Sequence, residues 1–429
     1  MNKKVILASI IGNALEFFDF TLYGVFSGVI AELFFPSSDL TASLLMSLGA
    51  FAVGFLMRPF GALIFGYLGD VFGRKKALSF SVLLMGVPTF IIAILPGHAS
   101  IGIFASLMIV FCRLLQGICT GGEYNGAAIF ALEHTRRKPG FTGGLITASC
   151  VIGAFSATFL GSITQIDGMP EWAWRVPFLL GAVISVAGFY IRKNLSETPE
   201  FLDNQAIPLT TFPLFKALFS YKKSCLLTFS LGALNGTLSY TLFGFLNIYL
   251  SRYLSVPLSE AMSINLFGLL AFMIGSPLLG AVYDRSKNHI FLKYASFLIF
   301  GGMIPIFLLN SSSTYSLIVI GQIALGICVA SIAGTGHAAM QKLFPVKERY
   351  SGISFFFSLG MGIFGGIAPM IYVQAIEKDN FPLLFPAYFL MALSILFFGI
   401  VKFCAFKEKK SDFSNTVQPL LCTQTDSSF

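Results

Sequence analysis

Long apolar segments recur along this chain and are separated by short polar stretches. About 20 apolar residues in a helix cross the ~30 Å hydrocarbon core of a bilayer. The chain is 55% hydrophobic and only 11% charged, whereas soluble domains carry about 25% charged residues, so a soluble fold is excluded. We predict an all-α integral membrane protein with twelve transmembrane helices, at 5–34, 43–69, 77–95, 101–131, 142–165, 173–191, 224–251, 258–283, 290–309, 315–341, 350–376 and 383–405.

Most of the 28 Lys and Arg residues fall in alternate loops between these segments. Loops rich in Lys and Arg face the cytoplasm under the positive-inside rule. The pattern therefore predicts that both termini lie in the cytoplasm, and we expect the protein in a plasma (cytoplasmic or inner) membrane. The same distribution accounts for the net charge of +8 without a nucleic-acid partner.

The longest polar interruption divides the predicted helices into two sets of six. A short repeat supports this division, because GYLGD (66–70) and GAVYD (280–284) end the second and eighth segments and precede basic loops. Transporters built from two parallel repeats bind substrate near the midplane, between the repeats. We predict an N-terminal bundle at 1–191, a central cytoplasmic loop at 192–223, a C-terminal bundle at 224–405 and a cytoplasmic tail at 406–429.

Five ionisable residues lie inside apolar segments of the first half, although each costs about 2.5–3.5 kcal/mol at bilayer depth. They are Glu16 and Asp19 in the first segment, Arg58 in the second, and Arg113 and Glu123 in the fourth. At about 1.5 Å per helical residue, all except Arg113 lie near one depth. Arg58 is therefore the expected partner of both acids on the first helix.

These charges have two interpretations. They could form permanent ion pairs with a structural role only. Alternatively, one carboxyl could carry a proton while an arginine holds a substrate carboxylate. For proton coupling the first candidate is Glu123, the second is Glu16, and Asp19 completes the set. The substrate-binding candidates are Arg58 and Arg113, together with the polar residues Tyr23, Tyr124, Asn125, Asn235, Tyr240 and Gln322. The alternative role for each polar residue is a helix–helix hydrogen bond, worth about 0.6 kcal/mol on average.

The segment GYLGDVFGRKKAL (66–78) resembles the cytoplasmic loop signature of the major facilitator superfamily. Within that superfamily, further segments resemble the metabolite:proton symporters, a group that includes proline/betaine, 2-oxoglutarate, citrate and shikimate carriers. These segments are GNALEFFDFTLYG (12–24), RPFGALIFG (58–66), RLLQGICTGGEYNGA (113–127), WAWRVPFLLG (172–181) and SETPEF (196–201). The resemblance implies the major facilitator fold and covers most of the first half.

The resemblance also implies a gate at the cytoplasmic side. There, Arg74 and Lys75 are expected to pair with Glu133 at the base of the fourth helix. In the second half, DRSKNHIF (284–291) departs from the family's Gly-Arg-rich form of the corresponding loop. The implied gate residues are Gly66, Asp70, Gly73, Arg74, Lys75, Glu133, Asp284 and Arg285.

Together these features predict a monomeric proton-coupled symporter that imports a small carboxylated metabolite or a zwitterionic osmolyte such as proline or betaine. The alternative is a proton symporter for a di- or tricarboxylate such as 2-oxoglutarate or citrate. A channel and an intramembrane aspartyl protease are remote alternatives. The sequence contains no Walker A motif that would support ATP-driven transport. We expect no enzyme activity, cofactor, metal or nucleic-acid partner. The expected partners are the substrate, protons and the bilayer.

Overall fold

The computed structural model describes residues 3–38, 40–135, 138–164, 168–203, 220–286, 288–377 and 382–404. The predicted tail at 406–429 and residues 204–219 of the predicted central loop lie outside these ranges. The regular secondary structure of the described residues is helical, as the apolar segments predict. The first half contains α1 (Lys3–Val25), α2 (Ser27–Phe34), α3 (Leu40–Val71), α4 (Arg74–Ile94), α5 (His98–Ile101), α6 (Ile103–His134), α7 (Pro139–Thr164) and α8 (Arg175–Lys193).

The second half follows a short helix, α9 (Pro199–Asp203). Its first membrane segment is α11 (Lys222–Tyr240), which continues through the π-helical turn η1 (Thr241–Phe245), α12 (Leu246–Ile248) and a second π-helical turn, η2 (Tyr249–Tyr253). The remaining elements are α13 (Leu258–Arg285), α14 (Asn288–Asn310), α15 (Tyr315–Gln341), α16 (Val346–Gly360), the π-helical turn η3 (Met361–Gly365), α17 (Gly366–Glu377) and α18 (Phe385–Phe403).

Eleven helical segments of the described residues are long and apolar enough to cross a membrane. The predicted span at 224–251 is not among them, although its helical path runs from Lys222 to Tyr253. The predicted first helix, 5–34, is interrupted at one residue, Phe26, between α1 and α2. The backbone N–H of Phe26 still donates to the Leu22 carbonyl at 3.0 Å, so the chain direction is largely kept.

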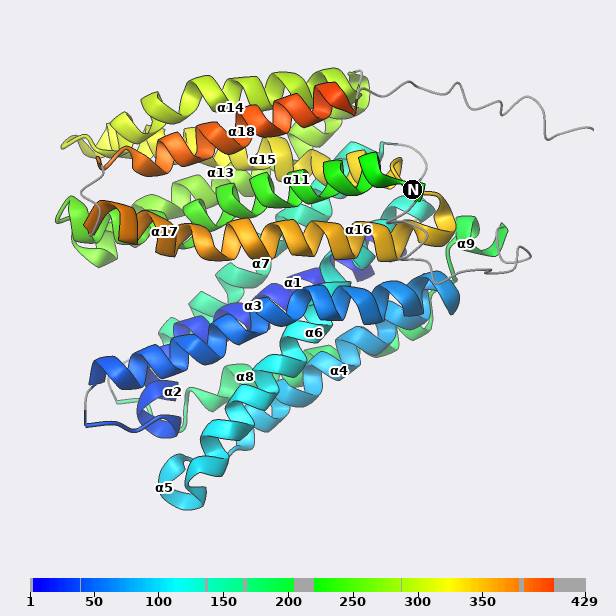
Figure 1. Cartoon of the computed structure of the whole chain (residues 1–429). Helices are drawn as coiled ribbons and strands as arrows, with labels where there is room; N and C mark the ends of the chain where they lie inside the picture. The colour runs from blue at the N-terminus through cyan, green and yellow to red at the C-terminus, as the bar shows by residue number, and fades with distance from the viewer. Residues whose placement is uncertain are drawn as a thin grey trace, which may run out of the picture.

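The helices pack in two groups (Figure 1). In the first, α1 packs on α7, α3 on α6, and α4 on α8; in the second, α13 packs on α15, α14 on α18, and α11 on α16. The groups meet where α7 packs on α13 and α15, and where α3 and α6 pack on α16. The exact domain boundaries at 191, 223 and 405 stay predictions.

Glycines allow the two groups to approach closely where they meet. A Cβ atom on Gly280 of α13 would collide with the backbone carbonyl of Gly140 on α7. A Cβ atom on Gly66 of α3 would lie 2.7 Å from the Cα atom of Ser351 on α16. Small residues at helix contacts are typical of membrane proteins, where close packing replaces the hydrophobic effect between helices.

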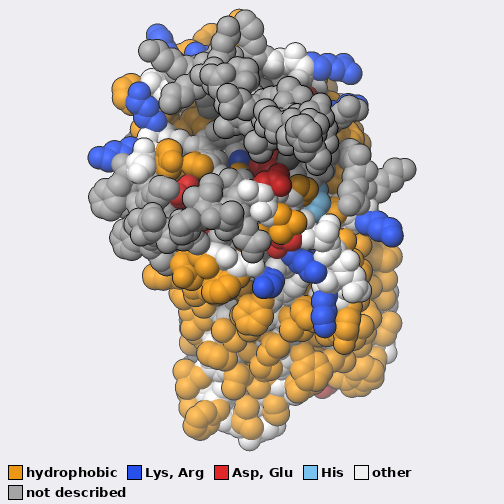
Figure 2. Space-filling view, turned by 90° about the vertical axis from the view of Figure 1, so that its right-hand side faces the viewer, with side chains coloured by type: hydrophobic (Ala, Val, Ile, Leu, Met, Phe, Trp, Pro, Cys, Tyr) orange, Lys and Arg blue, Asp and Glu red, His pale blue; other side chains and the backbone are white. Residues whose placement is uncertain are grey.

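The N-terminus, α9 and the end of α18 lie at the same end of the bundle (Figure 1). We call this the basic end, because Lys and Arg side chains gather around it in Figure 2, above a mostly hydrophobic flank. Large apolar residues are exposed on the helices, for example Phe80, Phe90 and Val183. Such a surface matches contact with lipid rather than water.

Candidate functional site

Glu16 and Arg58 face each other across α1 and α3, as the sequence predicts. Their closest charged atoms, Oε1 and Nη2, are 3.9 Å apart, and both side chains are buried. The Arg58 guanidinium also lies 5.1 Å from the ring centres of Phe20 and Phe55. Neither carboxylate oxygen of Glu16 has a hydrogen-bond partner among the described residues.

Asp19 does not pair with Arg58, which corrects the expectation that one arginine serves both acids. Its Oδ2 atom accepts a hydrogen bond from the Thr89 hydroxyl on α4 at 2.7 Å. Thr89 in turn accepts from the Gln116 amide at 2.9 Å, and Gln116 accepts from Nη1 of Arg113 at 2.8 Å. Hydrogen bonds therefore connect Asp19 to Arg113 through two neutral residues that the sequence analysis did not identify.

Arg113 is enclosed by aromatic rings. Its guanidinium lies 4.5 Å from the ring centre of Tyr23, 4.8 Å from that of Phe20 and 5.1 Å from that of Phe51. The Tyr23 hydroxyl donates to the Ser47 carbonyl at 3.1 Å. Within the described ranges, Nε and Nη2 of Arg113 lack hydrogen-bond acceptors, so this buried cation has donors available for a ligand.

Glu123 lies in a different environment from the other two acids. It forms a two-point ion pair with Arg192 of α8, one contact being 2.9 Å between Nη1 and Oε2 and the other joining Nη2 to Oε1. The Ser81 hydroxyl donates to Glu123 at 2.5 Å, and Arg192 also donates to the Leu78 carbonyl at 2.9 Å. Arg192 was predicted to lie in the central loop; it is instead buried in the last turn of α8.

Several predicted polar residues meet where the two helix groups face each other. The Tyr124 ring of α6 lies 4.7 Å from the imidazole of His337 on α15, centre to centre. Tyr124 also lies beside Asn235 of α11. Tyr240 of α11 contacts Phe55 edge to face at 5.3 Å. His337 is buried, and its Nε2 has no partner in the described part of the chain.

The remaining two polar candidates are less informative. Asn125 is buried on α6, and its Oδ1 atom has no hydrogen-bond partner in the ranges described. The Gln322 carbonyl accepts a hydrogen bond from Asn265 at 3.2 Å, inside the second group of helices. Among the described residues, Gln322 makes no hydrogen bond to the charged residues of the first half.

At the basic end, the predicted gate residue Asp70 joins the two helix groups. Its carboxylate accepts hydrogen bonds from the backbone N–H groups of Tyr350 and Ser351 on α16, at 3.0 and 2.8 Å. Arg74 lies 3.2 Å from Asp70 and donates to the carbonyl of Val346. Contacts of one carboxylate and one guanidinium thus hold α3 and α4 against α16.

Glu133 is the centre of a second set of contacts at this end. It pairs with Arg74 at 3.2 Å, as predicted, and with Arg349 of α16 at 2.9 Å. It also accepts from the Thr198 hydroxyl at 2.6 Å. Arg349 also pairs with Glu200 on α9 at 2.5 Å, so this short helix is joined to α16 by the same set of contacts.

Asp284 makes the equivalent contact in the second half, even though its loop departs from the usual family form. Its two oxygens accept from the backbone N–H groups of Gly140 and Phe141, at 2.6 and 2.9 Å. These are N–H groups of the first turn of α7, which have no partner within the helix and carry the positive end of its dipole. The Gly-x-x-x-Asp repeat thus places one carboxylate on a helix of the opposite group in each half.

Of the predicted gate residues, Lys75 and Arg285 have side chains outside these contacts, and Gly73 contributes through its backbone conformation. The Lys75 side chain does not pair with Glu133; its backbone N–H donates instead to Glu197. Arg285 is exposed, and its side chain takes no part in the contacts described above. Gly73 has a backbone φ of +108°, a conformation that strongly favours glycine.

Two groups of membrane helices, joined by carboxylates at repeated positions, are the arrangement expected of a transporter built from two parallel repeats. The sequence model of the Major Facilitator Superfamily matches residues 9–369, and the chain belongs to this family. The proline/betaine transporter of Salmonella typhimurium (strain LT2) is 30% identical over 421 residues, which cover 95% of this chain and 83% of that protein. The inner membrane metabolite transport protein YhjE of Escherichia coli (strain K12) is 33% identical over 403 residues, 89% of each chain.

Solved structures share the fold at low sequence identity. The proton:xylose symporter XylE, bound to 6-bromo-6-deoxy-D-glucose, superposes with a TM-score of 0.77 at 10% identity, over 93% of this chain and 94% of that one. The predicted family and fold are confirmed. The chain is a multi-pass membrane transporter and not an enzyme. Among the described residues, no three His, Cys, Asp or Glu side chains are placed to hold a metal ion.

Proposed function

We propose that the protein is a proton-coupled symporter of a small zwitterion with one carboxylate, of the proline or betaine kind. The names of the similar transporters support this class of substrate. The observation that carries the proposal is the set of unsatisfied polar atoms on Glu16, Asp19, Arg58 and Arg113. Since more than about 90% of buried polar groups have partners, such a set argues for a ligand.

Charge balance favours a zwitterion over a dicarboxylate. Two acids, Glu16 and Asp19, stand beside two arginines, Arg58 and Arg113, so the group is neutral when all four are ionised. A substrate without net charge preserves that balance before any proton is taken up, whereas a dianion would need two protons to compensate its charges, which are costly at this depth. This is the reason to place 2-oxoglutarate and citrate second.

The residues around Arg58 suit both ends of such a substrate. Arg58 can bind the carboxylate as a bidentate donor. Phe55 contacts the rings of Phe20 and Tyr240, and these aromatic rings offer faces to a secondary or quaternary ammonium group. A quaternary ammonium has no N–H to donate, so aromatic faces are the appropriate recognition surface.

Proton coupling follows from the pair of Glu16 and Arg58. When Arg58 turns to the substrate carboxylate, Glu16 loses its counter-charge and takes up a proton. When substrate leaves, Arg58 returns and the proton is released. Asp19, linked to Arg113, is a second candidate. Glu123 stays a predicted candidate too, but its two-point pairing with Arg192 argues for a structural role.

We further propose that the basic end faces the cytoplasm and is closed here. The contacts of Asp70 with α16 and of Asp284 with α7 would open when the bundles rock and substrate is released inward. The Lys and Arg residues gathered at this end support that orientation.

Reconstitution tests the proposal. Proteoliposomes with an inward proton gradient are given labelled proline, betaine, 2-oxoglutarate or citrate, with and without a protonophore. We expect concentrative uptake of proline or betaine that the protonophore abolishes. Uptake of a dicarboxylate alone would contradict the assigned substrate, and uptake that is indifferent to the proton gradient would contradict the coupling.

A further inference from the structure

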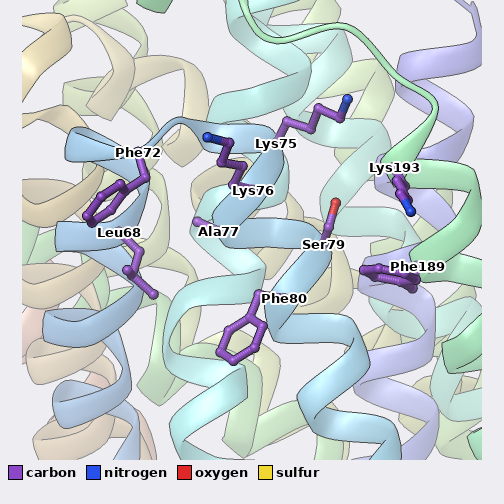
Figure 3. Close-up of a pocket in the computed structure, with 9 residues that line it drawn as sticks. All are labelled: Leu68, Phe72, Lys75, Lys76, Ala77, Ser79, Phe80, Phe189 and Lys193. Carbon is purple, nitrogen blue, oxygen red and sulfur yellow. The ribbon is translucent and has the colours of Figure 1, made fainter.

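A groove lies at the basic end, apart from the charged residues described above. It has a volume of about 550 Å³ and opens where α3, α4 and α8 meet (Figure 3). All three helices belong to the first group, so the groove is not part of the contact between the two groups. Its lining residues are Leu68, Phe72, Lys75, Lys76, Ala77, Ser79, Phe80, Phe189 and Lys193.

The charged residues of this groove are all cationic. Lys75, Lys76 and Lys193 line it, and no acidic residue does. Among the described residues, none of these three lysines has a side chain in a salt bridge. Glu197 accepts the backbone N–H of Lys75 but does not line the groove. The lining therefore carries a net positive charge, which a bound anion would balance.

A buried hydroxyl points into the same groove. Ser79 is only 7% exposed, and its Oγ has no hydrogen-bond partner in the described ranges. Figure 3 shows this oxygen directed to the side on which the lysines lie, between Lys75 and Lys193. Most buried hydroxyls are paired, and an oxygen of a phosphate group is a suitable acceptor for this one.

The other walls of the groove are apolar and open toward the hydrophobic flank. Phe72 and Phe80 are each 52% exposed, and Leu68 and Phe189 complete the apolar lining. A soluble phosphate would make no use of these rings. A phospholipid would place its phosphate near the lysines and lay its acyl chains along the phenylalanines.

We propose that this groove is a binding site for an anionic phospholipid. The phosphate contacts Lys76, Lys193 and the Ser79 hydroxyl, and an acyl chain packs against Phe80 and Phe72. Basic pockets between transmembrane helices at the inner surface are suited to such headgroups. The site is independent of the transported substrate, because it shares no residue with the group around Arg58 and Arg113.

Native mass spectrometry of the purified full chain tests this proposal. Protein is equilibrated with phosphatidylglycerol or phosphatidylcholine of equal acyl length, and retained lipid is counted. The test variant is Lys76→Gln with Lys193→Gln. Its matched control is Lys222→Gln with Lys402→Gln, two exposed lysines of the same end outside the groove. All four side chains are exposed, so both variants should fold.

We expect the wild type to retain phosphatidylglycerol over phosphatidylcholine. Each surface lysine strengthens binding of an anionic headgroup about fivefold, so the test variant should lose about 25-fold in affinity. The control should bind like the wild type, and Ser79→Ala should lose several-fold. Equal retention of both lipids, or equal losses in test and control variants, would overturn the proposal. Displacement of the lipid by an equal concentration of inorganic phosphate would identify a phosphate site instead and would also overturn it.

Discussion

The Asp284 carboxylate, in the second group of helices, accepts the backbone N–H of Gly140, in the first, at 2.6 Å. Asp70, in the first group, accepts the backbone N–H of Ser351, in the second, at 2.8 Å. Each acid ends one copy of the Gly-x-x-x-Asp repeat. The basic end is therefore held by two related contacts, in which a carboxylate of one group meets helical N–H groups of the other.

Replacing either acid should loosen its own contact. In Asp284→Asn the charge is lost, and amide exchange at Gly140 and Phe141 should rise about tenfold or more, since hydrogen bonds to charged groups contribute about 1.5–3 kcal/mol. Asp70→Asn should raise exchange at Tyr350 and Ser351. Hydrogen-exchange mass spectrometry measures both peptides, and each variant is the control for the other. Unchanged exchange at both sites would contradict this account.

Glu16→Gln should uncouple transport from protons. The glutamine keeps the size of the side chain but cannot bind and release a proton, so uphill uptake driven by a proton gradient should fall to background. Exchange of internal for external substrate needs no net proton movement and should persist. Glu32→Gln, an exposed acid on α2, is the control. Intact uphill uptake in Glu16→Gln would exclude Glu16 as the proton carrier.

Glu123→Gln should destabilise the protein. Breaking one side of a buried ion pair leaves Arg192 without its counter-charge, at a cost of about 3–5 kcal/mol. The double variant Glu123→Gln with Arg192→Gln should recover part of this loss. Thermal unfolding of the purified variants measures the effect. If Glu123→Gln unfolds like the wild type yet loses proton-driven uptake, the predicted proton-carrying role of Glu123 is favoured instead.

Phe55→Leu should weaken recognition of an ammonium group. The variant loses the aromatic face beside Arg58 and Tyr240, and a cation–π contact contributes about 0.5–2 kcal/mol, so the KM for betaine should rise about tenfold. Phe60→Leu on the same helix, with a ring that is 57% exposed, is the control. An equal rise in both variants would point to a general effect on the helix, not to a binding site.

Residues fixed by local motifs were predictable from the sequence. Asp70 and Asp284 end apolar segments, so their depth in the membrane follows from the pattern alone. The pairing of Arg74 with Glu133 followed from the family resemblance. What a one-dimensional pattern does not contain is the direction of a side chain around its helix.

Arg192 illustrates that limit. It precedes Lys193 at the end of an apolar segment, and the predicted central loop at 192–223 includes both residues. Successive residues of an α-helix point about 100° apart, so Arg192 faces Glu123 in the interior while Lys193 is exposed. The same limit applies to Lys75, whose neighbour Arg74 points inward and pairs with Glu133.

The link between Asp19 and Arg113 was missed for a different reason. Depth along each helix separated the two residues, and no charged residue lies between them. Thr89 and Gln116 bridge the gap with neutral hydrogen bonds. Such residues carry no hydropathy or charge signal in a sequence. Their role depends on the tilt and packing of α1, α4 and α6.

Arg349 is shared between Glu133 on α6 and Glu200 on α9, and this has a consequence for how the transporter can move. Helix α9 belongs to the stretch of chain that connects the two bundles. Any rotation that carries α16 away from α6 must either break the bond to Glu200 or drag α9 along. If the bond to Glu200 persists, α9 moves together with α16.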